Sequence, residues 1–242
     1  MTYQTGNLGL GGLLVGVLTH GLIVEGGKQN QRTQQQQEAD KVWDPYMPIL
    51  TDFGYRELAK RALSKTSSPG SVILAPDPNT ETNDTSKTAE SAPVFLMTRD
   101  QSAIMLENTV LLYEQQPGST GINHQTSMRV ISDPRETDDP IAFWTGNNGE
   151  ALKEEKARLL ALSLDIAMFD LSGGTGQSDL PYKTVRYREG SAEKMERAQV
   201  LVDRCNRILL RTLRGALMSV PSARPAESGT ENCRHISPQQ PS

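Results

Sequence analysis

The spacing of apolar residues predicts two amphipathic helices. Five apolar side chains between residues 51 and 66 recur at steps of three and four, which predicts a helix with Thr51 as its N-cap: Tyr55, Leu58, Ala59, Ala62 and Leu63. A second helix is predicted from Asn147 or Asn148 to about Leu171, and it is apolar almost all round in its C-terminal half. We therefore expect this second helix to be central. Residues 42–50 contain Pro45 and Pro48 and predict a break before the first helix.

Short apolar runs bounded by turn residues predict strands at 71–75, 93–98, 104–113 and 128–131. The second and third runs are joined by the turn Arg99–Ser102, which predicts an antiparallel hairpin. Residues 77–92 are almost without apolar side chains and predict a loop. Together these patterns predict an α+β fold, in which two or three helices pack on a small, mostly antiparallel sheet.

The segment from Ser191 to Met218 fits two secondary structures. A strand is predicted over 182–188, and after it the apolar residues follow helical steps. A helix here would carry a basic surface made of Arg197, Arg204, Arg207, Arg211 and Arg214. A helix is the prediction. The alternative is two strands, because 200–202 and 208–210 have the apolar, β-branched composition of strands.

Ahead of these elements lies a stretch of seventeen residues without a charge, from Leu8 to Val24. A membrane-spanning helix needs about 20 apolar residues, with a range of about 17–25, so this stretch is at the lower limit. Gly12 and Gly16 would share one face of a helix, with Gly9 seven residues before Gly16, and would allow a second helix to approach closely. No basic residue precedes the stretch and no small-residue cleavage site follows it, so a removable signal is not predicted.

This stretch resembles the glycine-zipper segments of bacterial envelope proteins, although His20 occupies the position of a third small residue. With the Gln-rich collar and polar remainder that follow, the chain resembles uncharacterised exported bacterial proteins. The resemblance implies a membrane-associated protein of the cell envelope with an extracytoplasmic domain. Lys28 and Arg32 follow the stretch and indicate the opposite orientation by the positive-inside rule, so the orientation stays open.

Four regions are therefore expected: an apolar glycine-rich helix over 1–25, a linker over 26–40, an α+β domain over 41–220 and a disordered tail over 221–242. Hydrophobic residues make up 36% and aromatic residues 5% of the chain, which indicates a modest core. The net charge of −4 indicates no nucleic-acid partner. Residues 77–139 carry eleven acids and four bases, a net of −7, and residues 183–214 carry nine bases and four acids, a net of +5.

Few side chains suggest catalysis or metal binding. His20 has no acidic partner in the apolar stretch, and His124 lies in a predicted loop without a nucleophile motif. The glycine run over 172–176 follows a helix rather than a strand and is interpreted as a helix end, not a phosphate loop. Four acids of a further loop lack calcium-binding spacing: Asp133, Glu136, Asp138 and Asp139. We predict no catalytic residue, no metal site and no cofactor.

Cys205 and Cys233 fit no metal-binding spacing, and a disulfide between them and two unpaired thiols are open alternatives. The favoured function is a non-enzymatic envelope protein that is tethered or self-associated through its glycine-rich helix and binds a protein partner. The alternatives are an enzyme with an unrecognised site, and binding of anionic lipid or nucleic acid through the arginine surface. Nucleic acid is disfavoured because no aromatic residues are interleaved with the arginines.

Overall fold

The computed structural model describes residues 41–67, 88–113, 122–176 and 179–223. Within them the chain forms one seven-stranded sheet and three α-helices, so the predicted α+β class is confirmed. The helical elements are the 3₁₀ turn η1 (Asp44–Tyr46), α3 (Met47–Thr51), α4 (Tyr55–Leu63) and α5 (Pro140–Leu171). The strands are β1 (Thr88–Met97), β2 (Ile104–Tyr113), β3 (Ile122–Ile131), β4 (Lys183–Glu189), β5 (Ala192–Arg204), β6 (Arg207–Thr212) and β7 (Leu217–Pro221). The predicted N-terminal helix and the predicted strand at 71–75 lie outside the described residues.

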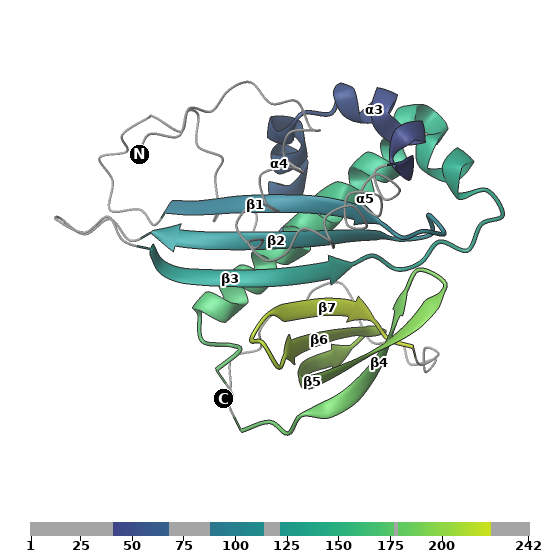
Figure 1. Cartoon of the computed structure of the whole chain (residues 1–242). Coiled ribbons are helices and arrows are strands. Elements are labelled where there is room, and N and C mark those ends of the chain that lie inside the picture. The colour runs from purple at the N-terminus through teal and green to yellow at the C-terminus, as the bar shows by residue number, and fades with distance from the viewer. Residues whose placement is uncertain (1–40, 68–87, 114–121, 177–178, 224–242) are drawn as a thin grey trace, which may run out of the picture.

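The strand order is β1-β2-β3-β7-β6-β5-β4, and β3 with β7 is the single parallel pair of this sheet. That pair has a short register, from Met128↔Leu217 to Val130↔Ser219, whereas β1, β2 and β3 pair over almost their full length. The sheet therefore divides into two parts, which we call the helical half (β1–β3 with the helices) and the curled half (β4–β7). Figure 1 shows α5 crossing behind β1–β3, with α3 and α4 beside it, and the curled half below.

The predicted hairpin over 93–113 is confirmed, with β1 and β2 joined at 98–103. The prediction of a loop over 77–92 is wrong at its end, because β1 begins at Thr88 and its polar residues pair along β2 at the edge of the sheet. Among the described strands, β1 is the first in the sheet order and pairs with β2 alone. The strand predicted at 128–131 is the last part of β3.

The predicted break over 42–50 is wrong. Pro45 and Pro48 lie in the first turns of η1 and α3, where a missing N–H costs nothing. Thr51 ends α3, with its hydroxyl donating to the carbonyl oxygen of Met47 at 2.8 Å, and it does not begin the next helix. That helix, α4, begins at Tyr55 after an extended Gly54.

Helix α5 has two pieces. Asp139 caps the first, its carboxylate accepting from the N–H of Ala142 at 2.9 Å. Residues 147–149 have left-handed backbone, and the longer second piece follows them, close to the predicted start at Asn147 or Asn148. Gly149 has a φ of 71° and lies against Ile49 of α3, whose side chain would be 2.3 Å from an added Cβ. Only glycine therefore fits at this bend.

The helix predicted over 191–218 is wrong, and the strand alternative is right: the segment forms β5, β6 and β7. Cys205 and Asn206 both have positive φ, 53° and 59°, and form the two-residue turn between β5 and β6. Turns of this kind favour Asn and Gly at both positions. Because Cys205 occupies the first position, the sequence does not show the usual turn pattern here. Gly215, with a φ of 83°, lies in the turn between β6 and β7.

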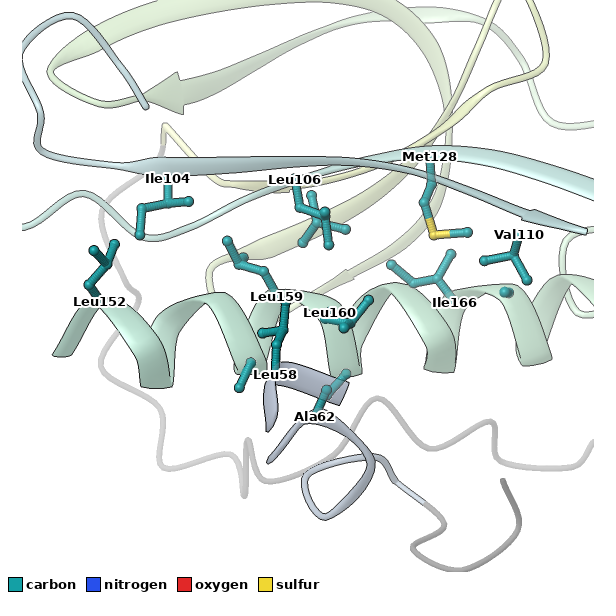
Figure 2. Close-up of a cluster of buried hydrophobic side chains, with 14 of the residues drawn as sticks. Leu58, Ala62, Ile104, Leu106, Val110, Met128, Leu152, Leu159, Leu160 and Ile166 are labelled. Carbon is teal, nitrogen blue, oxygen red and sulfur yellow. The ribbon is translucent and has the colours of Figure 1, made fainter. Parts of the chain in front are cut away.

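Two hydrophobic cores lie on opposite faces of the sheet, and each includes side chains of both halves: Leu209 and Leu217 of the curled half join the first, and Ile131 of β3 joins the second. In the helical half, α5 lies between the sheet and α4, and its leucines meet side chains of β2 and β3 (Figure 2). The second core lies on the opposite face of the sheet, where the curled half folds over on itself; its fully buried members include Ala198, Leu210 and Val220. A bridge between Tyr187 and Ser222 brings the edge strand β4 back to the end of β7. The curled half is therefore an incompletely closed barrel.

Candidate functional site

The arginine cluster is a group of five charged side chains where β3 ends, α5 passes and β6 begins. Its members are Asp133, Arg135, Glu155, Arg158 and Arg207. Three guanidinium groups and two carboxylates leave one positive charge in excess. Asp133 and Arg207 belong to two separate patterns of the sequence, the acidic loop and the predicted basic helix, and the structure brings them together.

Arg207 extends from β6 into the junction between the two halves and is almost fully buried. Its Nη1 donates to the carbonyl oxygen of Ile131 at 2.9 Å and to that of Ser219 at 3.3 Å, and its Nη2 donates to Asp133 Oδ1 at 2.9 Å. Burial and the charge of Arg158 lower the pKa of Arg207, although Asp133 opposes this shift. Arg207 therefore links the curled half to the end of β3.

Glu155 is buried on α5 and holds two arginines at once. Both of its oxygens accept from Arg158 Nε at 3.1 Å, and Oε2 accepts from Arg135 Nη2 at 3.0 Å. Arg135 also lies over the rings of Phe143 and Trp144, with its Cζ 5.7 and 5.8 Å from the two ring centroids. A guanidinium group on an aromatic face gains a cation–π attraction and a restricted orientation.

The outer part of this cluster is accessible. The side chains of Arg135 and Arg158 are 40% and 38% exposed, and Phe143 is 39% exposed. We call these three residues the Arg135 surface. Their positions were missed by the sequence analysis; the single available signal was the spacing of three between Glu155 and Arg158.

The predicted basic surface does not form as one face. Arg207 is buried, and Arg211 donates through Nη2 to the backbone oxygen of Thr175. Arg197, Arg204 and Arg214 are exposed, but Arg204 precedes the turn at one end of β6 and Arg214 lies in the turn at its other end. The arginines are therefore distributed over the curled half.

The predicted acidic loop is also divided among different partners. Asp133 binds Arg207, Glu136 lies 3.8 Å from Arg188, and Asp139 caps α5. No group of three His, Cys, Asp or Glu side chains in the described ranges could hold a metal ion.

The histidine cluster joins β3 to the end of α5. His124 lies in β3, not in the predicted loop, and its Nε2 is 2.8 Å from Asp170 Oδ2 and 2.9 Å from Thr126 Oγ1. Thr126 donates to the same carboxylate oxygen at 2.6 Å, and Thr175 donates to the other. Burial opposes ionisation of Asp170, but these hydrogen bonds and His124 lower its pKa overall.

This arrangement favours a structural role for His124. In a nucleophile–histidine–acid triad the hydroxyl and the carboxylate meet different ring nitrogens, whereas here Thr126 and Asp170 meet the same one. The glycines that follow close the helix: Gly173 has a φ of 81°, and the N–H of Gly174 donates to the carbonyl oxygen of Phe169 at 3.0 Å. The helix-end interpretation of 172–176 is therefore confirmed.

A pocket of about 240 Å³ lies in the curled half, beside the edge strand β4. Val185, Val200 and Ile208 supply apolar walls. Its charged lining residues are two bases and two acids, Lys183, Arg186, Glu193 and Asp203. The charges oppose one another, so the lining selects no single class of charged ligand.

Lys156 is a buried amine that the sequence analysis did not single out. It lies in the apolar part of α5 and is 3% exposed, with its ammonium 4.6 Å from the ring centroid of Phe95 and 5.9 Å from those of Trp43 and Phe53. Burial lowers the pKa of Lys156 to about 8. Lys156 therefore makes cation–π contacts with the segment that contains Trp43 and Phe53 and with Phe95 of β1.

The remaining predicted residues lie outside the described part of the chain. Gly9, Gly12, Gly16 and His20 are all in that group, as is Cys233, so the Cys205–Cys233 disulfide stays a prediction. None of the helices in the described ranges is long and apolar enough to cross a membrane. Comparison of the chain with protein-family models, with curated proteins and with solved structures found no match.

Proposed function

We propose that this chain is a non-enzymatic, membrane-associated protein of the bacterial cell envelope whose folded region binds a protein partner through the Arg135 surface. Residues 8–24 would tether the chain or associate it with a second copy. The observation that carries the binding proposal is a half-exposed aromatic ring next to two half-exposed arginines that are already held in place.

Aromatic and arginine side chains contribute most of the affinity in many protein interfaces. Arg135 is positioned by Glu155 and by the ring of Phe143, so little conformational entropy remains to be lost when a partner binds. This pre-organisation distinguishes the Arg135 surface from the scattered exposed side chains elsewhere, such as Met195 and Leu213.

The alternatives have weaker support. An enzyme centred on His124 would need a nucleophile or substrate that approaches a ring nitrogen, and Nε2 is already engaged by Asp170 and Thr126. Binding of nucleic acid or anionic lipid would need a continuous basic face, and the five predicted arginines do not share one.

Photo-cross-linking in cells tests the binding surface. A photoreactive amino acid at position 143 is compared with one at Met168, which is similarly exposed near the other end of α5. We expect a single defined protein adduct from position 143 and none from position 168. Equal adduct patterns from both positions, or no adduct from either, would contradict the proposal.

Membrane association is tested separately. We expect the chain to stay with the membrane fraction in high salt and to be released by detergent, because an apolar segment is held by the hydrocarbon and not by surface charge. Release by high salt alone would contradict the tether. Replacement of Gly12 and Gly16 by leucine should weaken self-association in membranes if these glycines allow close helix packing.

A further inference from the structure

We infer that the segment recognised at the Arg135 surface is acidic: a partner's Asp or Glu carboxylate bonds to Arg135 and Arg158, with an apolar side chain against Phe143. The inference rests on the proposed protein-binding function and specifies its partner. It starts from the hydrogen bonds that the two guanidinium groups leave unmade.

Glu155 does not satisfy either arginine completely. Arg135 bonds to it through Nη2 alone, and Arg158 through Nε and Nη2. Neither Nη1 has a partner among the described residues, and Arg135 Nε is the one buried side-chain nitrogen or oxygen there without a hydrogen bond. Both side chains share the Glu155 carboxylate and are 40% and 38% exposed, so their Nη1 groups remain available to a further acceptor. Planar guanidinium donors match the geometry of a second carboxylate.

The net charge of the cluster also favours an acidic ligand. Two carboxylates compensate two of the three guanidinium groups, so the cluster has one positive charge in excess, and the charge of Arg158 lowers the pKa of Arg207. One incoming carboxylate would complete the compensation. An extended polyanion such as a nucleic acid or a lipid surface would also meet two exposed acids, Asp133 of the cluster and Glu136 close to it in the sequence. An acidic peptide is favoured because it can present a single carboxylate.

The test is a titration of the full chain with a short fluorescein-labelled peptide that carries one glutamate next to leucine in an otherwise uncharged sequence, followed by fluorescence anisotropy. A peptide with glutamine in place of glutamate is the matched control. We expect binding of the glutamate peptide that weakens with salt, and an affinity at least about tenfold lower for the glutamine peptide.

Three variants sharpen the result. Arg135→Gln removes the charge and Arg135→Lys keeps the charge but lacks the planar donors of the guanidinium group. Each should lower the affinity by about tenfold. Arg197→Gln removes an exposed arginine on β5 and should leave the affinity within about twofold. Circular dichroism establishes that each variant is folded, and Arg135→Lys keeps the test valid if Arg135→Gln is not.

Several results would overturn the inference. These are equal binding of both peptides, full binding by Arg135→Lys, equal weakening by Arg197→Gln, no binding at low salt, or binding of phosphatidylglycerol vesicles that is lost in Arg135→Gln when the peptide does not bind. If position 143 still cross-links to a protein when the peptide does not bind, the partner surface stands and acidic recognition fails. If neither is seen, both proposals fail.

Discussion

The two halves of the sheet are built from the same kind of hairpins but are stabilised differently. The helical half buries one face under α5 and α4, in a core of 22 buried side chains that includes Leu209 and Leu217 of the curled half. The curled half buries the opposite face of the sheet in a smaller core of eight side chains, seven of its own and Ile131 of β3. The larger core is expected to determine the global stability, and the smaller one depends on how firmly it is attached.

Three polar links supplement the short β3–β7 pairing. Arg207 bonds to Asp133 and Ile131, Arg211 bonds to the backbone of Thr175, and Asp100 accepts from the N–H of Ser191 at 2.7 Å. These links place a buried arginine at the junction, and the Arg135 surface lies directly outside it. The candidate binding surface is therefore made of residues of α5 and of the segment between β3 and α5, next to the junction.

The largest expected effect distinguishes the two cores. Leu159 and Leu210 are both fully buried, one in each core. We expect Leu159→Ala to lower the free energy of unfolding by about 4 kcal/mol and Leu210→Ala by about 2–3 kcal/mol, because the open curl can relax around the lost atoms. Urea titrations measure both values. A larger loss for Leu210→Ala would reverse the assignment of the main core.

The next effect tests the junction. Arg207→Met removes the guanidinium group that bonds to Ile131, Ser219 and Asp133, and we expect a loss of about 2 kcal/mol. Arg204→Met is the matched control on the exposed end of β5 and should change stability by less than about 0.5 kcal/mol. Equal stability of the two variants would show that Arg207 does not hold the junction.

Replacement of Lys156 is expected to raise the free energy of unfolding, whereas the preceding substitutions lower it. Its pKa is about 8 in the folded chain, below the ordinary value of 10.5, so the unfolded chain binds the proton more strongly. Stability should therefore rise between about pH 8 and pH 10.5. Lys156→Met keeps the length of the side chain, and we expect it to stabilise the fold by about 2 kcal/mol at pH 7 and to remove this part of the pH dependence. A destabilised variant with an unchanged pH profile would contradict the assignment.

The smallest effect concerns the link at Asp100. Burial alone would raise the pKa of Asp100, but hydrogen bonds from Ser191, Thr98 and Ser102 lower it well below its ordinary value of 3.8. Its stabilising contribution is therefore present above about pH 4 and is lost as the pH falls further. We expect Asp100→Ala to cost about 1 kcal/mol at pH 7 and to accelerate hydrogen exchange at Ser191. Asp138→Ala, in an exposed loop, should do neither.

The helical half was largely predictable from the sequence, because its strands and helices show their periods clearly. The curled half was not. A spacing of four, as between Arg207 and Arg211, places residues on one side of a helix and equally on one face of a strand. The turn at Cys205–Asn206 carried no glycine to break the helical pattern.

The candidate site was predictable only in fragments. Asp133 and Arg207 attracted attention as members of an acidic loop and a basic helix, and their pairing follows from the β3–β7 contact, which joins segments far apart in the chain. The buried positions of Glu155 and Lys156 follow from the packing of α5 against elements on both sides. Local patterns in the sequence do not contain this information.

Native-state hydrogen exchange tests most directly the claim that the two cores differ in stability and that the buried Arg207 helps to hold the curled half to the helical half. The amide of Leu106 in β2 should exchange only through global unfolding, whereas that of Leu210 in β6 should exchange at a lower free energy. In Arg207→Met the gap between the two should widen. Equal exchange free energies at both positions, falling together in the variant, would contradict the account.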